Sequence, residues 1–303
     1  MKIAPPGRMV DVGGRALHVH ATGTGGPVVV LEAGIAASSV SWSLVQEKLT
    51  PLTTVVSYDR AGFGWSDAGP VCTARDAALD LILMLACAGY PGPYVLVGHS
   101  YGGLIVRICQ QEFPELVAGL VLVDPVVRGE WREMSEEKRR ILQRGAMLSR
   151  RGALLARLGI VRIALTLLRS GSKRIPKLMA RVSAGNGASV TDRLVGEVRK
   201  MPKEHWPAIA WHWSRERSFS AMAGNLESLP ASVRQLDSGR SLGDLPVVVL
   251  SAGKEVREHA ADARLSSRWE ALVVKDSGHW IQLDASNVVV AAIERVVREV
   301  RAR

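Results

Sequence analysis

A serine flanked by two glycines offers the clearest chemistry in this sequence. The run Gly98-His99-Ser100-Tyr101-Gly102 follows a short apolar segment and precedes a helical pattern. This context is typical of a nucleophilic serine on a tight turn between a strand and a helix. Glycines at both flanks remove side chains that would clash there, and the first N–H groups of the helix point to where negative charge develops. We therefore predict that Ser100 is the nucleophile of an acyl-transfer reaction.

Short β-branched runs alternate with helical patterns through the first 125 residues. The predicted strands are Arg15–Ala21, Pro27–Ala33, Thr53–Asp59, Pro93–His99 and Val117–Asp124. The predicted helices are Trp42–Leu49, Thr73–Ala88 and Tyr101–Phe113. Continuous apolar strands suit a parallel sheet that is buried on both faces. The alternation predicts an α/β fold with a mostly parallel sheet and helices on both of its faces.

The alternation stops after residue 125 and resumes with two strands, Pro246–Ser251 and Ala271–Asp276, and a closing helix over 285–300. Residues 126–240 between them show helical pattern with little strand signal. A chain of 303 residues with 47% hydrophobic content can bury one large core together with an inserted subdomain. We predict a core domain from residues 1–125 and 241–303, and a helical insertion from 126–240.

Three further motifs accompany the serine turn: Leu31–Ile35 (LEAGI), Tyr58–Asp67 (YDRAGFGWSD) and Ser277–His279 (SGH). With the serine turn they extend from about residue 10 to the C-terminus, and only the insertion is unmatched. In this combination the chain resembles the α/β-hydrolase superfamily. The resemblance implies that fold, with the insertion as a helical cap over the site, and it says little about the substrate.

The same resemblance implies the partners of the serine. It places the general base at His279, on the loop before the closing helix. It assigns the two N–H donors of an oxyanion hole to Tyr101 and Ile35. Ala33 stands where many members have His, and Glu32 is a candidate to hold the loop instead, although it could equally be a salt-bridged or solvated carboxylate.

Two carboxylates are candidates for the acid that orients His279. Asp124 ends its strand at the same sheet edge as Ser100, whereas Glu255 occupies the position where the family more commonly places the acid. Glu is one methylene longer and less usual there. We favour Asp124 on the geometric requirement that the acid hydrogen-bonds the base, and Glu255 stays open as the alternative.

A serine nucleophile excludes the reactions that need a carboxylate nucleophile, such as epoxide opening through an alkyl-enzyme ester. Acyl transfer to water is the natural outcome, and we predict hydrolysis of carboxylic esters through an acyl-Ser100 intermediate. A peptidase or a carbon–carbon bond hydrolase of the same fold is the first alternative. A ligand-binding receptor with little turnover is the second.

The predicted cap gathers tryptophan and positive charge. It holds 23 of the 39 Lys and Arg residues and 10 of the 29 Asp and Glu residues. We expect an apolar substrate pocket, with candidate contacts at Gly34, Trp131, Trp206 and Trp211. Nucleic acid is a weak explanation of the charge, because aromatic residues make up only 5% and no nucleic-acid module is recognised.

The segment Ile141–Leu168 mixes aliphatic residues with regularly spaced arginines. If it formed one helix, one stripe would lie within about 20° and contain Arg144, Arg151, Arg162 and Arg169. Such a stripe suits peripheral contact with an anionic membrane surface, and it equally suits a solvated outer helix face. Three glycines could break the helix: Gly145, Gly152 and Gly159.

The remaining composition argues for a cofactor-free protein. Cys72, Cys87 and Cys109 match no disulfide or zinc spacing, and we expect buried free thiols. The histidines show no metal-ligand spacing, so we predict neither metal nor cofactor. The N-terminus lacks an apolar run and no stretch reaches membrane-spanning length, which favours a cytoplasmic protein.

Overall fold

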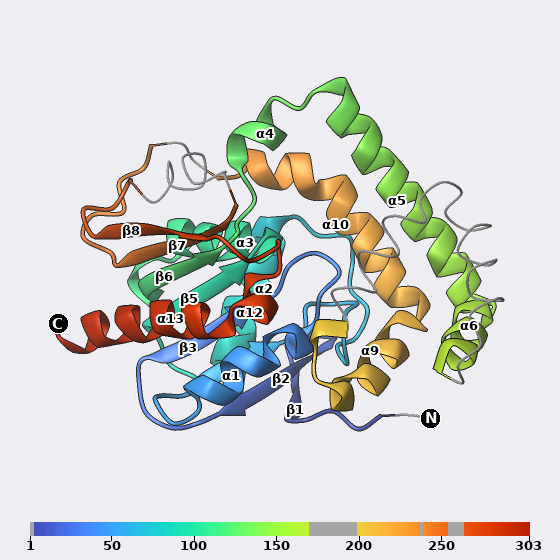
Figure 1. The fold of residues 1–303 in the computed structure, drawn as a ribbon, viewed down its shortest axis with the longest axis horizontal. Coiled ribbons are helices and arrows are strands. Elements are labelled where there is room, and N and C mark those ends of the chain that lie inside the picture. The colour runs from blue at the N-terminus through green and yellow to red at the C-terminus, as the bar shows by residue number, and fades with distance from the viewer. Residues whose placement is uncertain (1–2, 170–198, 237–238, 254–263) are drawn as a thin grey trace.

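The computed structural model describes residues 3–169, 199–236, 239–253 and 264–303. These residues form one eight-stranded sheet in the order β1-β2-β4-β3-β5-β6-β7-β8 (Figure 1). The strands are β1 (Arg8–Asp11), β2 (Ala16–Thr22), β3 (Val28–Glu32), β4 (Val55–Tyr58), β5 (Tyr94–His99), β6 (Val117–Val123), β7 (Val247–Ala252) and β8 (Trp269–Val274). Pairing is antiparallel between β1 and β2 and between β2 and β4, and parallel across the other strands. The prediction of a mostly parallel sheet is confirmed.

Helices cover both faces of the sheet. On one face lie α2 (Ala74–Ala88) and α3 (Tyr101–Glu112), and on the other α1 (Ser43–Leu49) and α13 (Ser286–Arg301). Alternate residues of one strand serve the two layers, since Leu96 packs toward α2 and α3 whereas Val95 and Val97 pack toward α1 and α13. This period of two explains why the central strands read as unbroken apolar runs.

Local sequence fixes the ends of α2. Thr73 and Asp76 form a reciprocal capping box at its start, and Gly89 closes it with a left-handed φ of +78°. Between these ends α2 buries one face, and Cys87 lies on the other. Cys87 is therefore exposed, which makes the expectation of three buried thiols wrong there; Cys109 is buried, Cys72 is half-buried, and all three are free.

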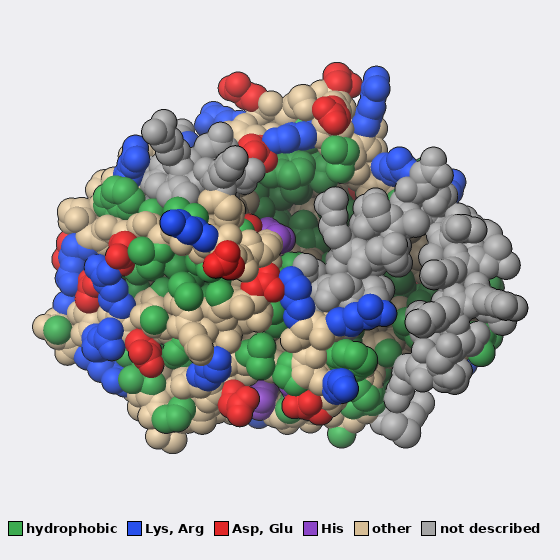
Figure 2. Space-filling view, viewed as in Figure 1, with side chains coloured by type: hydrophobic (Ala, Val, Ile, Leu, Met, Phe, Trp, Pro, Cys, Tyr) green, Lys and Arg blue, Asp and Glu red, His purple; other side chains and the backbone are tan. Residues whose placement is uncertain are grey.

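The described part of residues 126–240 is helical and lies between β6 and β7. It comprises α4 (Arg128–Arg132), α5 (Glu136–Arg157), α6 (Ile160–Arg169), α9 (Trp206–Trp213) and α10 (Glu216–Arg234). Short helices elsewhere, or joining these, are η1 (Ser39–Trp42), η2 (Pro114–Leu116), η4 (Lys203–His205) and α12 (Ile281–Asp284). Figure 2 shows a hollow between the sheet and the inserted helices, lined by hydrophobic side chains, with a histidine at its edge.

Helix α5 continues through two of the three glycines that could have broken it. Gly152 faces α10, where a Cβ would lie 2.5 Å from the Phe219 ring, so the missing side chain lets the helices approach. Gly159 has a φ of +75° and separates α5 from α6. The stripe predicted for one helix is thus divided: Arg144 and Arg151 lie on α5, and Arg162 lies on α6.

In the described ranges, no helix is both long enough and apolar enough to cross a membrane. The same residues contain no group of three or more His, Cys, Asp or Glu side chains that could hold a metal ion.

Candidate active site

Ser100 sits at a strained turn between β5 and α3. Its φ of +54° and ψ of −117° lie outside the regions that most side chains adopt. A Cβ on Gly98 would lie 2.5 Å from the Gly102 carbonyl oxygen, and one on Gly102 would lie 2.4 Å from the carbonyl oxygen of Glu32. Only glycine fits at both flanks. The Ser100 N–H donates to the Val123 carbonyl at 3.0 Å, which ties the turn to the end of β6.

Asp124 and His279 meet beside this turn. The Nδ1 of His279 lies 2.6 Å from Asp124 Oδ2, and Asp124 Oδ1 accepts a hydrogen bond from the Ala252 N–H at 2.8 Å. Asp124 itself has a φ of +43°, and its N–H donates to the Leu250 carbonyl at 2.7 Å. The carboxylate is therefore fixed between β6 and β7. Its contact with Nδ1 leaves Nε2 as the ring nitrogen that can exchange protons.

Of the two candidate acids, Asp124 lies in the described part of the chain. Asp124 is buried and contacts His279, whose side chain is 52% exposed. Glu255 lies outside the described residues.

Asp284 holds the loop that carries His279. Its Oδ2 accepts from the Gly278 N–H at 2.9 Å, and its Oδ1 pairs with Lys200 Nζ at 2.7 Å. Burial alone would raise the pKa of Asp284, but the Lys200 and Gly278 hydrogen bonds lower it. The histidine loop is therefore tied to a residue of the inserted segment.

His99 packs beneath the site and bridges two loops. Its Nε2 donates to the His279 carbonyl at 2.8 Å, and the two rings are 4.7 Å apart. On its other side a Cβ on Gly34 would lie 2.9 Å from His99 Nδ1 and 3.3 Å from the Ser100 Cβ. The Gly34 backbone therefore passes directly beside Ser100, and its contact with substrate stays a prediction.

Arg60 anchors the Gly34–Ile35 loop, a role that the sequence did not suggest. Its guanidinium donates to the Ala33 carbonyl and, at 2.7 Å, to the Gly34 carbonyl. The same group forms an ion pair with Glu32, which also accepts from the Tyr58 hydroxyl. Glu32 is fully buried; burial raises its pKa and the Arg60 cation counteracts that rise. Glu32 thus contacts Arg60, and Arg60 in turn holds the loop. The position of Arg60 within the Tyr58–Asp67 motif was the one sequence feature that pointed to this role.

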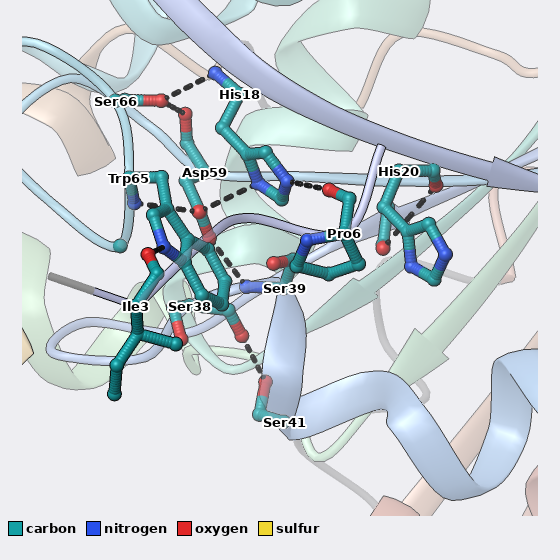
Figure 3. A network of polar contacts seen from close by, with 12 residues as sticks. Ile3, Pro6, His18, His20, Ser38, Ser39, Ser41, Asp59, Trp65 and Ser66 are labelled. Atoms are coloured by element: carbon teal, nitrogen blue, oxygen red, sulfur yellow. Dashed lines mark hydrogen bonds and ion pairs between the residues drawn. The ribbon is translucent and has the colours of Figure 1, made fainter. Parts of the chain in front are cut away.

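A second network fixes the backbone that presents Arg60 (Figure 3). The Asp59 carboxylate accepts from the N–H groups of Ser39 at 2.7 Å and Trp65 at 3.0 Å, and it contacts His18 Nδ1 at 2.8 Å. Burial alone would raise the pKa of Asp59, but His18 and these hydrogen bonds lower it to about 2. Burial alone would lower the pKa of His18, but Asp59 raises it. His18, on β2, therefore helps to hold Asp59 and the backbone around it in place.

The predicted tryptophan contacts separate in space. Trp131 is half-buried against the core and lies on α4. This helix begins two residues after Val126, and the Val126 N–H donates to the Ser100 carbonyl. Trp211 joins a cluster that includes Trp280, the residue after His279. Trp206 is 36% exposed and donates to the Met201 carbonyl. Contact of these rings with substrate stays a prediction.

Two buried histidines make stability depend on pH. Burial, with the nearby His279, lowers the pKa of His99 to about 3, and burial lowers that of His212 to about 4. As the pH falls from 6.5 to 5, the unfolded chain takes up protons at both histidines while the native chain takes up almost none, so the free energy of unfolding decreases. The slope from the pair should be about 1.4 kcal/mol per pH unit at pH 6.5, where the unfolded histidines are half protonated, and should approach about 2.7 kcal/mol per pH unit near pH 5. The raised native pKa of His18 acts in the opposite sense, because at this site the native chain binds the proton more tightly than the unfolded chain does.

Urea unfolding at several pH values measures this slope. His212→Gln should remove about half of it, because one of the two suppressed protonations is lost. An unchanged slope in His212→Gln would show that native His212 already binds a proton in this range.

The alpha/beta hydrolase family matches residues 17–293, and the chain belongs to that family. It is 34% identical over 122 residues to the "Putative carbamate hydrolase RutD" of Klebsiella pneumoniae, covering 39% of this chain and 43% of that protein. The matching stretches cover between 18% and 51% of the length of eight curated relatives.

Solved structures share the fold. ALR0039 from Nostoc sp. PCC 7120 superposes with a TM-score of 0.72 at 17% identity, covering 95% of this chain and 96% of the other. The epoxide hydrolase CorEH gives a TM-score of 0.65 at 17% identity, covering 96% and 98%. At these identities the likeness concerns the fold alone.

Proposed function

We propose that this chain is a serine esterase that hydrolyses carboxylic esters with apolar acyl groups through an acyl-Ser100 intermediate. The observation that carries the proposal is the strained Ser100 turn beside the His279–Asp124 hydrogen bond of 2.6 Å. A hydroxyl at such a turn, with a base that is itself oriented by a carboxylate, is the arrangement that activates a serine.

In the proposed mechanism His279 Nε2 takes the Ser100 proton as Oγ attacks the ester carbonyl carbon. The resulting oxyanion accepts hydrogen bonds from the N–H groups of Tyr101 and Ile35. The tetrahedral intermediate then expels the alcohol, which leaves with the proton from His279. Water repeats the sequence on the acyl enzyme: His279 takes its proton, the acid is released, and Ser100 Oγ regains a proton. Asp124 stabilises the imidazolium in both halves.

The substrate class follows from the nucleophile and the surroundings. Ser100 supports acyl transfer rather than the alkyl-enzyme route of a carboxylate nucleophile. The hydrophobic hollow of Figure 2 favours apolar acyl groups, and the inserted helices, as a cap, would help to exclude water. Carbamates react by the same acyl-transfer chemistry, so the RutD likeness makes them the second substrate to test.

A panel of p-nitrophenyl substrates tests the proposal. We expect turnover to rise from acetyl to medium-chain acyl esters, with a burst of nitrophenol that matches the enzyme concentration. A preference for p-nitrophenyl carbamates would replace the ester assignment, and opening of styrene oxide would contradict the serine mechanism. Folded protein that binds apolar ligands without any burst would favour a receptor.

Arg60 gives a further prediction about the oxyanion loop. Arg60→Met removes the donors to two loop carbonyls, and we expect kcat/KM to fall by about 10²-fold as the hole loses its shape. The single change also leaves Glu32 buried and unpaired, which costs about 3–5 kcal/mol of stability.

The double variant Arg60→Met/Glu32→Gln separates the two effects. It removes the unpaired charge, so thermal stability should largely return while kcat/KM stays low. If activity returned together with stability, Arg60 would serve only the core and not the loop.

A further inference from the structure

The outer face of α5 and the adjoining part of α6 combine positive charge with exposed aliphatic side chains. From Lys138 to Arg169 the chain has nine Lys or Arg residues and no Asp or Glu. The exposed aliphatic and thioether side chains in this stretch are Ile141 (59%), Met147 (44%), Leu154 (57%), Leu158 (63%) and Ile163 (58%). We call these side chains, with Arg144, Arg151 and Arg162, the α5–α6 face.

Packing determines which side of α5 faces outward. Leu142, Ala146 and Ala153 are buried on the side that packs against α10. At 100° per residue the opposite side spans about 80° and carries Arg144, Met147, Arg151, Leu154 and Leu158. Arginine and apolar side chains therefore lie together on one surface of α5, the helix that runs from the top of Figure 1 down toward α6.

Three arginines of this face have no acidic partner in the part of the chain that the structure describes. Arg150 pairs with Glu227 at 2.8 Å, but Arg144, Arg151 and Arg162 make no ion pair among the described residues. Beside them Met147 and Leu154 line an open groove of about 490 Å³, with Arg150 and Arg151 along it. A water-exposed leucine gains nothing from a guanidinium neighbour in solution. At a lipid surface, the guanidinium would meet phosphate groups and the leucine would meet acyl chains.

We propose that the α5–α6 face docks on an anionic lipid bilayer. The guanidiniums bind lipid phosphates at the headgroup level, and the leucine, isoleucine and methionine side chains enter the boundary with the acyl chains. The long arginine stems allow both at one depth. The exposed apolar side chains of the face are all non-aromatic, which favours lipid over a single-stranded nucleic acid, since bases need aromatic rings to stack on.

Vesicle sedimentation tests docking without any reaction. We expect the protein to sediment with vesicles of phosphatidylcholine containing about one third phosphatidylglycerol, to remain in solution with pure phosphatidylcholine, and to be released by salt. Arg144→Glu/Arg151→Glu should weaken binding by about tenfold or more. Leu154→Ser/Leu158→Ser should weaken it as well, although the net charge is unchanged.

Controls keep the proposal falsifiable. Arg264→Glu/Arg298→Glu changes the net charge by the same amount away from the face, and it should bind nearly as well as the parent. Equal losses of vesicle binding in both arginine pairs would show non-specific attraction. RNA binding that Arg144→Glu/Arg151→Glu abolishes and the leucine changes leave intact would assign the face to a polyanion. Either result, or no sedimentation, overturns the proposal. Turnover of a soluble short ester should be unchanged in every variant, which keeps this test separate from the esterase proposal.

Discussion

Ser100→Ala is expected to lower kcat/KM for an activated ester by about 10⁴-fold or more. The change removes the oxygen that would form the acyl enzyme, and it leaves the backbone and Cβ at the strained turn in place. Residual activity would come from binding and the oxyanion donors alone. The steady-state rate and the burst amplitude on a p-nitrophenyl ester measure the effect, and the melting temperature should change little.

Ser267→Ala is the matched control, because Ser267 is exposed and lies before β8, outside the site motifs. It should behave like the parent. If Ser100→Ala kept more than about a tenth of the activity, another residue would have to be the nucleophile and the proposed function would fail.

Asp124→Asn is expected to have the second-largest effect, a fall in kcat of about 10⁴-fold. Asparagine cannot stabilise the imidazolium, and its NH₂ group can fix His279 in the tautomer whose Nε2 is already protonated. The fold should tolerate the change, because asparagine accepts a φ of +43° well and keeps an oxygen for the Ala252 N–H.

Glu255→Gln is the natural comparison for the acid. We expect it to lower kcat far less than Asp124→Asn does. A larger loss in Glu255→Gln, with Asp124→Asn active, would move the acid to the other strand end and overturn the pairing described for His279.

Much of the fold was predictable because the sheet core is encoded locally. Strands buried on both faces, such as β5, need unbroken apolar sequence. The turn that follows β5 is indicated by Gly98 and Gly102. The first strand, β1, was missed. Only one of its four residues is buried, so its pattern carries almost no apolar signal, and it depends on pairing with β2.

The site was less predictable wherever partners come from distant segments. Asp124 and the residues after β7 reach one sheet edge, since Val123 lies beside Leu250, so strand order alone could not choose the acid. Arg60 and Glu32 meet because β3 and β4 pair, and nothing within either segment indicates the ion pair. Gly152 was a candidate helix break, but its contact with Phe219 depends on where α10 packs.

The most direct test of the central claim is to locate the covalent adduct formed by a fluorophosphonate. The reagent phosphonylates an activated serine, and peptide mass spectrometry then identifies the modified residue. The proposed mechanism predicts one adduct per chain, on Ser100, with loss of ester turnover in parallel and no adduct in Ser100→Ala. Full turnover without an adduct on Ser100, or an adduct on another residue that accounts for the inhibition, would contradict it.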